Sequence, residues 1–470
     1  MKCGLPRTYE NRGESKSYKA QLSGEESELL EVGPEPGINN LVLRRSSRNF
    51  ALRQELLAHQ ARIAAWLRRA EAQMNFHGEG TVHLSRRINH RRRTGAVLLT
   101  PRFVPLIISL GHFFVLPAAA TAQPAWALDS SPIFSFGGDS APVDDLYGIV
   151  GVLGLRNGRV VVADRAQRLL ILDADGGLVR TMGSRGQGPG EFESISGISI
   201  GASDTVYVFD RNYRVSKFTA DGGFAASMQQ TSVPPLPFAG VFDDGSYLAA
   251  NGAPTGRVQG TEVRLVRNDL ELMRLDAAGN FVGAIATVPG HESLLFAERA
   301  PGVRSRRGAG GLRTTHFATH GEEVFVTSGD RLEVLVFPMT GGQPTVIGRE
   351  AKLLPFTRED LLETFAGHPL ERLVTPSAVA WWPDDRRRAA VVSLLVDDLG
   401  YVWLEENRLD LDAPGTWSVF HRSGAYVASV VMPGRYRAFD VRGNVVYGVW
   451  RDEFDVEYVQ ARSLNRGNVR

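Results

Sequence analysis

The chain is almost free of cysteine, and its larger part is almost free of lysine. Cys3 is the only cysteine, so residues 123–470 offer no disulfide, no thiol nucleophile and no lipid-anchoring cysteine. Only Lys217 and Lys352 occur in that part, and its positive charge is otherwise arginine. It holds 35 basic and 42 acidic residues. This acidic balance argues against nucleic-acid binding, which needs a basic surface.

The first 122 residues have the opposite balance, with 18 basic and 10 acidic residues. The stretch RRINHRRR at 86–93 precedes an apolar run that ends in Ala120-Thr121-Ala122. A basic stretch, an apolar core and an A-x-A pattern in this order predict a secretory signal. A second A-x-A pattern ends at Ala127, so the apolar core and cleavage region span 103–127, and the mature chain is expected to begin at Gln123 or Leu128. We therefore expect an exported protein, either periplasmic or extracellular.

Two alternatives remain open for this leader. Pro105, Gly111 and Pro117 interrupt the apolar run, which favours a cleaved signal over a permanent anchor. An uncleaved signal would leave the protein membrane-anchored. Residues 1–102 form a basic leader much longer than a signal needs. Either the natural chain starts at Met74, or the residues before it are a cytoplasmic tail with one helix.

The stretch GSRGQGPGEFES at 183–194 has five glycines or prolines in its first eight positions. A phosphate-binding loop would continue with Lys, then Ser or Thr, and open a helix. Here Glu191, Phe192 and Glu193 follow, and after them the β-rich ISGISIG. The stretch is therefore predicted to connect two strand units.

An internal repeat supports this interpretation. Residues 160–182 and 206–228 align without a gap and are identical at ten of 23 positions. Both contain an Asp-Arg pair, a later arginine, an Ala-Asp-Gly-Gly turn and a final methionine. Repeats of this length with short strands are the signature of a β-propeller. The Asp-Gly-Gly turn supplies the positive φ that a tight hairpin needs.

Weaker copies continue to the C-terminus and bring the number of units to six. The last unit begins near Tyr436 and has only three strands, so residues 131–138 are predicted to add the fourth strand and close the ring. The predicted fold class is all-β, a six-bladed β-propeller of four-stranded antiparallel blades over 131–465, preceded by a non-globular leader and signal segment. Two insertions interrupt it, an arginine-rich loop at 298–313 and a partly helical stretch at 351–390.

The residues from Gly183 to Phe224 resemble an NHL repeat. They contain a G-x-G-P-G-x-F linker, a G-I inner strand, a V-Y-V-x-D second strand and an N-x-R-V-x-x-F third strand. The first two blades match this pattern well, and the others match it only in strand and turn rhythm. Some propellers that resemble this class are lactonases or metal-dependent lyases, which use histidine and acidic residues around the central channel.

Three motifs are better explained by strands and turns than by catalysis. Ser199 lies in a G-x-S-x-G string but is expected inside a strand, whereas a nucleophile elbow joins a strand to a helix. His316 and His320 fall on a predicted inner strand, where four residues span roughly 13 Å, so they cannot chelate one metal alone. The DADGG stretch at 173–177 lacks the glutamate of a calcium loop. We expect no metal, no cofactor and no catalytic residue.

Charged pairs recur where the second strand of a unit turns into the third. They are Asp164-Arg165, Asp210-Arg211, Asp330-Arg331 and Arg451-Asp452. In a propeller these turns lie on the same face as the linkers, and arginine suits carboxylates and phosphates. The alternative is that the pairs only stabilise their turns through local hydrogen bonds. The candidate ligand-binding residues are Arg165, Arg185, Asp210, Arg211, Arg331 and Arg451.

These observations predict an exported, monomeric binding or scaffold module without its own catalytic centre. Its partner would be a protein or a small polar or anionic ligand, bound near the entrance to the central channel. The alternative is a propeller enzyme of lactonase or metal-dependent lyase type. Fold alone does not decide between them, because function depends on the site.

Overall fold

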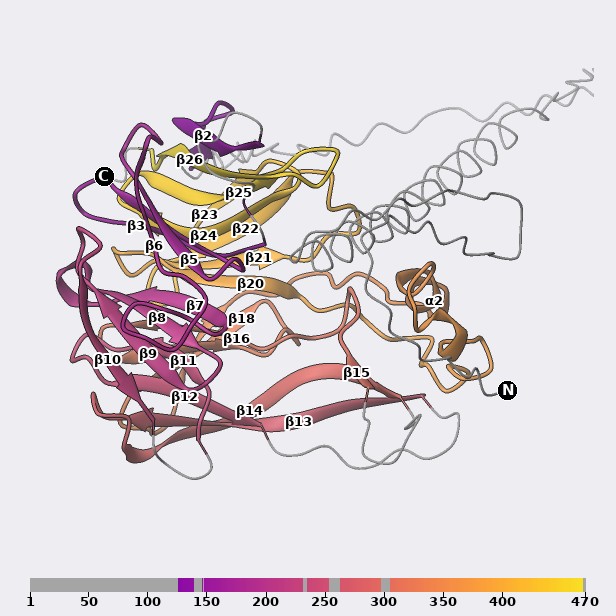
Figure 1. The fold of residues 1–470 in the computed structure, drawn as a ribbon. Coiled ribbons are helices and arrows are strands. Elements are labelled where there is room, and N and C mark those ends of the chain that lie inside the picture. The colour runs from indigo at the N-terminus through magenta and orange to yellow at the C-terminus, as the bar shows by residue number, and fades with distance from the viewer. Residues whose placement is uncertain are drawn as a thin grey trace, which may run out of the picture. The chain divides into compact units, whose positions relative to one another are not determined.

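The computed structural model describes residues 126–138, 146, 148–230, 235–252, 263–296 and 305–467. Met74 and all of the predicted signal before Trp126 lie outside these residues. The described chain forms six antiparallel sheets, built mainly from four strands in sequence order (Figure 1). The first two sheets, or blades, comprise β3 (Ile149–Gly154), β4 (Val160–Asp164), β5 (Arg168–Leu172) and β6 (Leu178–Met182), then β7 (Ile195–Ile200), β8 (Val206–Asp210), β9 (Arg214–Phe218) and β10 (Phe224–Gln229).

The other four blades follow the same plan with more variation. The third and fourth blades comprise β11 (Phe238–Val241), β12 (Tyr247–Gly252), β13 (Val263–Leu275), β14 (Phe281–Phe296) and β15 (Ser305–Arg307), then β16 (His316–His320), β17 (Glu323–Thr327), β18 (Glu333–Pro338) and β19 (Thr345–Gly348). The fifth and sixth blades comprise β20 (Val391–Val396), β21 (Val402–Glu406), β22 (Gly415–Phe420) and β23 (Tyr426–Met432), then β24 (Tyr436–Arg442), β25 (Val445–Arg451) and β26 (Glu457–Asn465).

The second strand of a blade is apolar almost throughout because both of its faces are covered. All positions of β4 (VVVAD) and of β8 (VYVFD) are buried. Runs without polar alternation are typical of strands packed on both sides. The outer strand β10 (FAASMQ) is instead exposed at all but one position. The apolar content of a strand therefore reports its depth in the blade.

The first strands of the six blades stand side by side and close a ring. Each first strand contacts the next one, in the order β3, β7, β11, β16, β20 and β24, and β24 contacts β3. Six sheets arranged in this way form a six-bladed β-propeller, so the predicted fold class is confirmed. Linkers between blades and turns between second and third strands share one end of the blades, which we call the linker face.

Glycine is required in the turns between third and fourth strands. Gly176 and Gly222, in the two Ala-Asp-Gly-Gly turns, have φ of +84° and +82°, a region that side chains disfavour. A Cβ on Gly176 would also lie 2.6 Å from the ring of Phe134. The predicted hairpin turns are present, and the first of them packs against the strand that closes the ring.

The N-terminal end of the described chain completes the sixth blade. β2 (Phe134–Gly137) pairs antiparallel with β26, Phe134 opposite Ala461 and Phe136 opposite Val459. The strand predicted within 131–138 therefore closes the ring. A further strand, β1 (Ala127–Leu128), pairs with the same edge of β26 and was not predicted.

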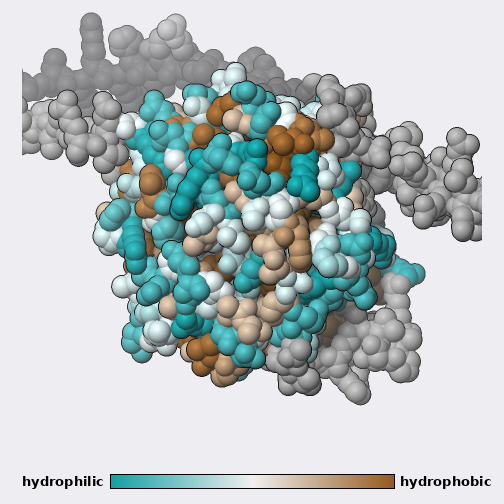
Figure 2. Space-filling view, turned by 60° about the vertical axis from the view of Figure 1, so that its left-hand side comes forward, coloured by the Kyte–Doolittle hydropathy of each residue, from teal (hydrophilic) through white to brown (hydrophobic). Residues whose placement is uncertain are grey.

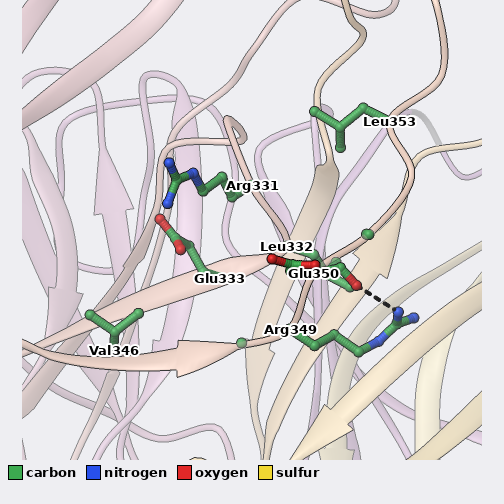
Figure 3. Close-up of a pocket in the computed structure, with 9 residues that line it drawn as sticks. Arg331, Leu332, Glu333, Val346, Arg349, Glu350 and Leu353 are labelled. Atoms are coloured by element: carbon green, nitrogen blue, oxygen red, sulfur yellow. Dashed lines mark hydrogen bonds between the residues drawn. The ribbon is translucent and has the colours of Figure 1, made fainter.

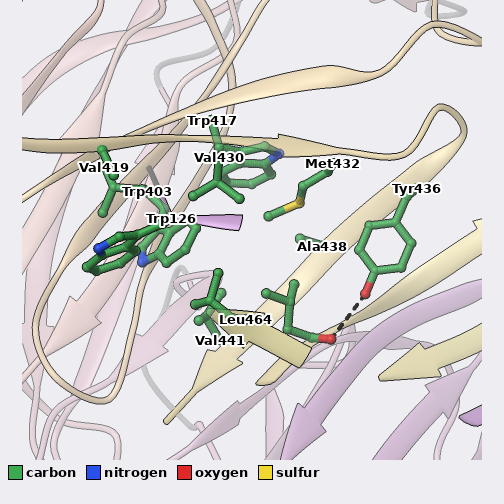
Figure 4. Packing of buried hydrophobic residues seen from close by; sticks show 12 residues of the cluster. Trp126, Trp403, Trp417, Val419, Val430, Met432, Tyr436, Ala438, Val441 and Leu464 are labelled. Atoms are coloured by element: carbon green, nitrogen blue, oxygen red, sulfur yellow. Dashed lines mark hydrogen bonds between the residues drawn. The ribbon is translucent and has the colours of Figure 1, made fainter. Parts of the chain in front are cut away.

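Trp126, next to β1, fills the core between the fifth and sixth blades (Figure 4). Trp126 is only 2% exposed. Its ring centroid lies 5.1 Å from that of Tyr401 and 5.6 Å from that of Trp403. The Arg466 guanidinium stacks on it at 4.6 Å and is held by Asp397 Oδ2 at 2.9 Å. Trp126, inside the predicted cleavage region 103–127, is thus part of the propeller core.

The described parts of the two predicted insertions pack together on the linker face. α2 (Arg358–Thr364) begins at a capping box in which Thr357 accepts from Asp360 N and Asp360 accepts from Thr357 N. Apart from the short 3-10 helix Glu371–Leu373, the remainder of 351–390 is not helical. One apolar cluster joins both insertions to the ends of β13 and β14: Val263, Leu294, Phe296, Leu312, Phe356, Leu361, Phe365, Leu370, Val374, Val379 and Trp382.

The face opposite the linker face carries polar residues with apolar residues among them (Figure 2). Figure 2 brings the left-hand side of Figure 1 forward and shows a mostly hydrophilic surface there. No helix among the described residues is long and apolar enough to cross a membrane.

Candidate ligand-binding site

The glycine-rich stretch 183–194 is the linker between the first two blades, as predicted, and its polar groups are used internally. Phe192 is fully buried, its N–H donates to Ser184 O at 2.9 Å, and its carbonyl accepts from Gly186 N at 3.1 Å. Glu191 accepts from Gly188 N at 2.8 Å. The loop is folded around its own side chains and offers no cradle for a phosphate.

Arg214 and Asp210 hold this linker from the second blade. The Arg214 guanidinium donates to Gln187 O at 2.7 Å and to Glu191 O. The Asp210 carboxylate accepts from Glu193 N and Ser194 N, both at 2.8 Å. Asp210 is buried, and these bonds occupy both of its oxygens. Its predicted role as a ligand-binding residue is therefore replaced by a structural one.

Asp164 behaves in the same way in the first blade. It is fully buried, accepts from Ala166 N at 3.0 Å and pairs with Arg168 at 2.9 Å. The residue that follows each aspartate is different, because Arg165 and Arg211 are both exposed on the linker face. The acid of each pair thus builds the turn, and the arginine projects from it.

Asp330 belongs to an ion-pair network that ties the insertions to the propeller. It pairs with Arg267 at 2.8 Å, and Arg313 Nε lies 2.9 Å from its carboxylate. Arg313 and Arg386 both pair with Glu292, at 3.1 and 2.5 Å. Burial raises the pKa of Glu292, but bonds and charge from Arg386 and Arg313 outweigh it and lower the pKa. The acidic and basic side chains of this network therefore neutralise one another.

The first strands of the blades, which surround the central channel, are irregular near its mouth. In five blades the pairing of the first strand skips one residue, and these bulged residues are Val150, Ser196, Ala239, Val392 and Phe439. In the sixth blade, Arg437 lies two residues before the bulged Phe439 in β24. Its guanidinium stacks on the Phe439 ring at 4.4 Å.

Arg437 lies near two further arginines. Arg437 is exposed, and partial burial of its side chain among its neighbours lowers the pKa of Arg437. The charges of Arg451 and Arg165 lower it further, whereas those of Glu405 and Glu457 raise it. Arg165 comes from the first blade, and its side chain passes over Gly148, whose missing Cβ would lie 2.9 Å from Arg165 Cδ.

The carboxylates near these arginines are already engaged. Glu457 pairs with Arg451 at 2.6 Å and accepts from Ile149 N at 2.8 Å. Glu405 pairs with Arg408 at 2.6 Å, and burial raises the pKa of Glu405 overall. Within the described part of the chain, no carboxylate is within ion-pair distance of Arg165 or Arg437. The mouth therefore carries unneutralised positive charge.

A small hollow opens beside Arg437 between the last and first blades. Its volume is about 40 Å³, and its lining residues are Ile149, Arg435, Arg437, Phe439, Val449, Arg451 and Glu457. This is room for about one water-sized polar group. The hollow suits a single carboxylate or similar anionic group at the end of a ligand whose remainder lies outside.

The two histidines of the fourth blade stand at opposite ends of the inner strand β16, as predicted. His316 pairs with Thr327, and His320 pairs with Glu323. Burial and, to a smaller extent, the charges of His291 and Arg437 together lower the pKa of His316 to about 4, so its imidazole is neutral at physiological pH. Over the described ranges, no group of three or more His, Cys, Asp or Glu residues is placed to hold a metal ion.

The predicted site residues separate into groups. Arg451 lines the same hollow at the channel mouth as Arg437, and the charge of Arg165 acts on Arg437 there. Arg185 and Arg211 are exposed on and beside the first linker, where Arg211 N donates to Ser194 O at 3.0 Å. Arg331 lines another hollow, of about 530 Å³, at the outer edge of the fourth blade together with Glu333, Val346, Arg349 and other residues (Figure 3).

Sequence reasoning missed Arg437, which is central to the mouth. A signal was present, because Arg437 lies in the first strand of the last blade, next to the channel. Reading the inner strands as a set would have shown that only β24 places an arginine beside the channel entrance. Repeat alignment favoured the turns instead, because only the first two blades align well.

Comparisons with known proteins agree with the fold. A family model described as a 6-bladed beta-propeller matches residues 143–247. The chain has a six-bladed propeller fold. A solved structure of a protein from Bacteroides fragilis, described as exported, is 11% identical in sequence and has a TM-score of 0.42. The alignment covers 73% of this chain and 96% of that protein's chain.

Two other solved structures are similar at the same level. A member of the DUF4221 family from Bacteroides vulgatus is 10% identical with a TM-score of 0.45, covering 73% of this chain and 98% of its own. The WD40 repeats of RRP9 are 10% identical in sequence and have a TM-score of 0.40. The alignment covers 73% of this chain and 99% of the RRP9 chain. No curated protein matches the chain.

Proposed function

We propose that this protein is an exported, monomeric binding module without a catalytic centre, and that its ligand is anionic and docks at the channel mouth. The observation that carries the proposal is the meeting of Arg165, Arg437 and Arg451, of which only Arg451 has a described carboxylate partner. Like charges that outnumber the counter-charges beside them are costly in the free protein. An anionic group placed among them would relieve that cost.

The surroundings of these arginines support a prearranged site. Phe439 supports the Arg437 guanidinium, and the bond from Ile149 N holds Glu457, which in turn orients Arg451. A fixed guanidinium loses little freedom when it binds, so its planar fork is effective for carboxylates and sulfates. The insertions, which share a core on the same face, would supply further contacts to a larger ligand.

The other elements of the proposal rest on the sequence. The basic stretch, apolar run and A-x-A patterns before Trp126 support export. The G-x-G-P-G-x-F linker and the strand patterns of the first two blades support their assignment as NHL repeats.

The test is a thermal-shift and calorimetric screen of the purified protein with citrate, inorganic phosphate and a sulfated oligosaccharide. A ligand that binds only the folded state raises Tm. We expect at least one of these probes to raise the Tm of the wild type, and the Arg165→Gln/Arg437→Gln variant to lose that shift. Loss of two charge-assisted contacts should weaken binding by roughly a hundredfold.

Two matched variants sharpen the result. Arg185→Gln/Arg211→Gln removes two exposed arginines from the same face and should retain binding. Arg211→Gln/Arg331→Gln tests the sequence-based expectation that the turn arginines bind the ligand. A probe whose binding survives in Arg165→Gln/Arg437→Gln, or is lost only in Arg211→Gln/Arg331→Gln, contradicts a site at the channel mouth.

A further inference from the structure

Two neighbouring turns on the linker face expose large apolar side chains. One turn joins β21 to β22 and contains Leu409 and Leu411, and the other joins β25 to β26 and contains Phe454 and Val456. Their exposed fractions are 64%, 67%, 73% and 38%. Among the large hydrophobic residues of the described chain, Phe454, Leu411 and Leu409 are the three most exposed. We call residues 409–412 and 452–456 the acidic lip.

Arg435 joins the two turns into one surface. Its N–H donates to Leu411 O at 3.0 Å, and its guanidinium pairs with Asp412 at 2.6 Å and donates to Asp452 O at 2.6 Å. Asp452 also closes its own turn by accepting from Phe454 N and Val456 N. The apolar side chains are thus presented by rigid turns and are not the tips of loose loops.

The charge of the lip is strongly one-sided. Its acidic residues are Asp410, Asp412, Asp452, Glu453 and Asp455, and Arg435 is the cation among them. Within the described ranges, Asp410, Glu453 and Asp455 have no ion-pair partner. Carboxylates therefore alternate with exposed leucine, phenylalanine and valine along both turns.

We propose that the acidic lip is a docking surface for a basic segment of a partner protein that carries apolar side chains between its arginines or lysines. Exposed apolar side chains that gather on a rigid surface mark interaction sites. The carboxylates then select the sign of the partner and speed its approach. The surface goes beyond the anion site at the channel mouth, because it has the opposite charge and its apolar and acidic side chains do not line that site, although Arg435 borders both.

The same charges disfavour the other occupants of an apolar surface. Two copies of the lip would bring like charges together, which costs free energy on association. An anionic lipid surface attracts basic patches and repels this one. A basic and apolar protein segment satisfies both halves of the lip.

The experiment measures binding of a short synthetic peptide, in which arginine alternates with leucine, to the full chain by fluorescence polarisation. Two matched peptides replace arginine by glutamate or leucine by serine. We expect only the arginine–leucine peptide to bind, with affinity that falls as salt is added. Leu411→Ser/Phe454→Ser should weaken it roughly tenfold or more, and Asp410→Asn/Glu453→Gln/Asp455→Asn should weaken it and reduce its salt dependence.

Control variants show whether peptide binding depends on the acidic lip itself. Val346→Ser/Leu399→Ser removes two apolar side chains that are 60% and 59% exposed, and should bind the peptide like the wild type. Val346 lies in the fourth blade, and Leu399 lies in the turn between β20 and β21, at the end of the fifth blade opposite the lip. Arg165→Gln/Arg437→Gln should also bind it normally, so failure of the anion site leaves this proposal intact. Thermal melts verify that each variant is folded.

Three results would overturn the proposal. The first is equal binding of all three peptides by the wild type, or no binding of any. The second is unchanged binding by Leu411→Ser/Phe454→Ser. The third is self-association in analytical ultracentrifugation, or attachment to anionic lipid vesicles, that the same variant abolishes, because the lip would then serve a second copy or a membrane.

Discussion

The junction between the first and second blades and the junction between the sixth and first blades use the same hydrogen bond with different chemistry. In the first case the Gln167 side chain accepts from Ile195 N at 2.7 Å, at the start of the next inner strand. In the second case the Glu457 carboxylate accepts from Ile149 N at 2.8 Å, at the equivalent position. A neutral amide is sufficient where the chain itself connects the blades, and a carboxylate stands where residues 308 positions apart must meet.

The charged junction has consequences that the neutral one lacks. A hydrogen bond to a charged acceptor stabilises by about 1.5–3 kcal/mol, against about 0.5–1.5 kcal/mol for a neutral one. The carboxylate also attracts Arg451 to the channel mouth. The seam that closes the ring is therefore also where the charge of the candidate site gathers. At the other end of β3, Asp440 of the sixth blade accepts from Gly154 N at 2.9 Å.

The strongest way to break the seam is to remove its outer strand. Deleting residues 131–138 takes away β2, including Phe134 and Phe136, which are 7% and 6% exposed. Each buried phenylalanine is worth about 3–5 kcal/mol, and the deletion also uncovers the edge of β26. We expect Tm to fall sharply or cooperative unfolding to be lost, as measured by circular dichroism.

Ile133→Ala is the control for this deletion, because Ile133 is 51% exposed and its loss should change stability by less than about 0.5 kcal/mol. A deletion variant that melts like the parent would mean that the ring is closed by other contacts.

A second test concerns Trp126. Trp126→Ala should cost about 3–5 kcal/mol, because it empties a site lined by Tyr401, Trp403 and Arg466. Cleavage after Ala127 would remove the same side chain, so we expect the mature protein to begin at Gln123. Urea denaturation measures the first effect and N-terminal sequencing of exported material the second. A mature chain that begins at Leu128 and is as stable as one with Trp126 would refute this prediction.

Much of the fold follows from local sequence, and the seam shows where that ends. The Asp-Gly-Gly turns, the linker 183–194 and the closing strand could be predicted from φ requirements, from a repeat and from a strand count. Trp126 could not, because its role depends on residues from the fifth blade that are far away in sequence. The site divides similarly. Arg165 and Arg451 could be predicted as site residues from their positions in turns. The burial of Asp210 and the residues that surround Arg437 could not, because they depend on how the blades pack against one another.

The third test compares the two junctions directly. Glu457→Gln makes the seam chemically like the first junction and should cost about 1 kcal/mol, the difference between a charged and a neutral acceptor. Glu457→Ala leaves Ile149 N without a partner and should cost about 2–3 kcal/mol. Gln167→Ala also leaves a backbone N–H, that of Ile195, without its acceptor. The lost acceptor is neutral and the bond is only partly buried, so the cost should be about 1 kcal/mol. Urea denaturation measures all three, and equal costs for Glu457→Ala and Gln167→Ala would show that the two junctions do not differ.

A fourth test concerns a pH dependence at the far end of the seam. Burial raises the pKa of Asp440 from 3.8 to about 6, and Asp398 raises it as well, although the Gly154 N–H and Arg442 act in the opposite direction. The folded protein therefore holds this proton more tightly than the unfolded chain does. Ionised Asp440 costs stability above about pH 6, and the cost disappears as the pH falls toward about 4.

Asp440→Asn should remove that dependence while retaining an oxygen acceptor for Gly154 N. We expect the variant to be up to about 3 kcal/mol more stable than the wild type near pH 8, and the difference to vanish near pH 4, because a rise of the pKa from 3.8 to about 6 corresponds to about that free energy. Urea denaturation at several pH values gives the profile. Asp410→Asn is the control, because Asp410 is exposed and should leave the profile unchanged. Parallel profiles for wild type and Asp440→Asn would mean that the carboxylate is already compensated, with Arg442 as the nearest source of that compensation.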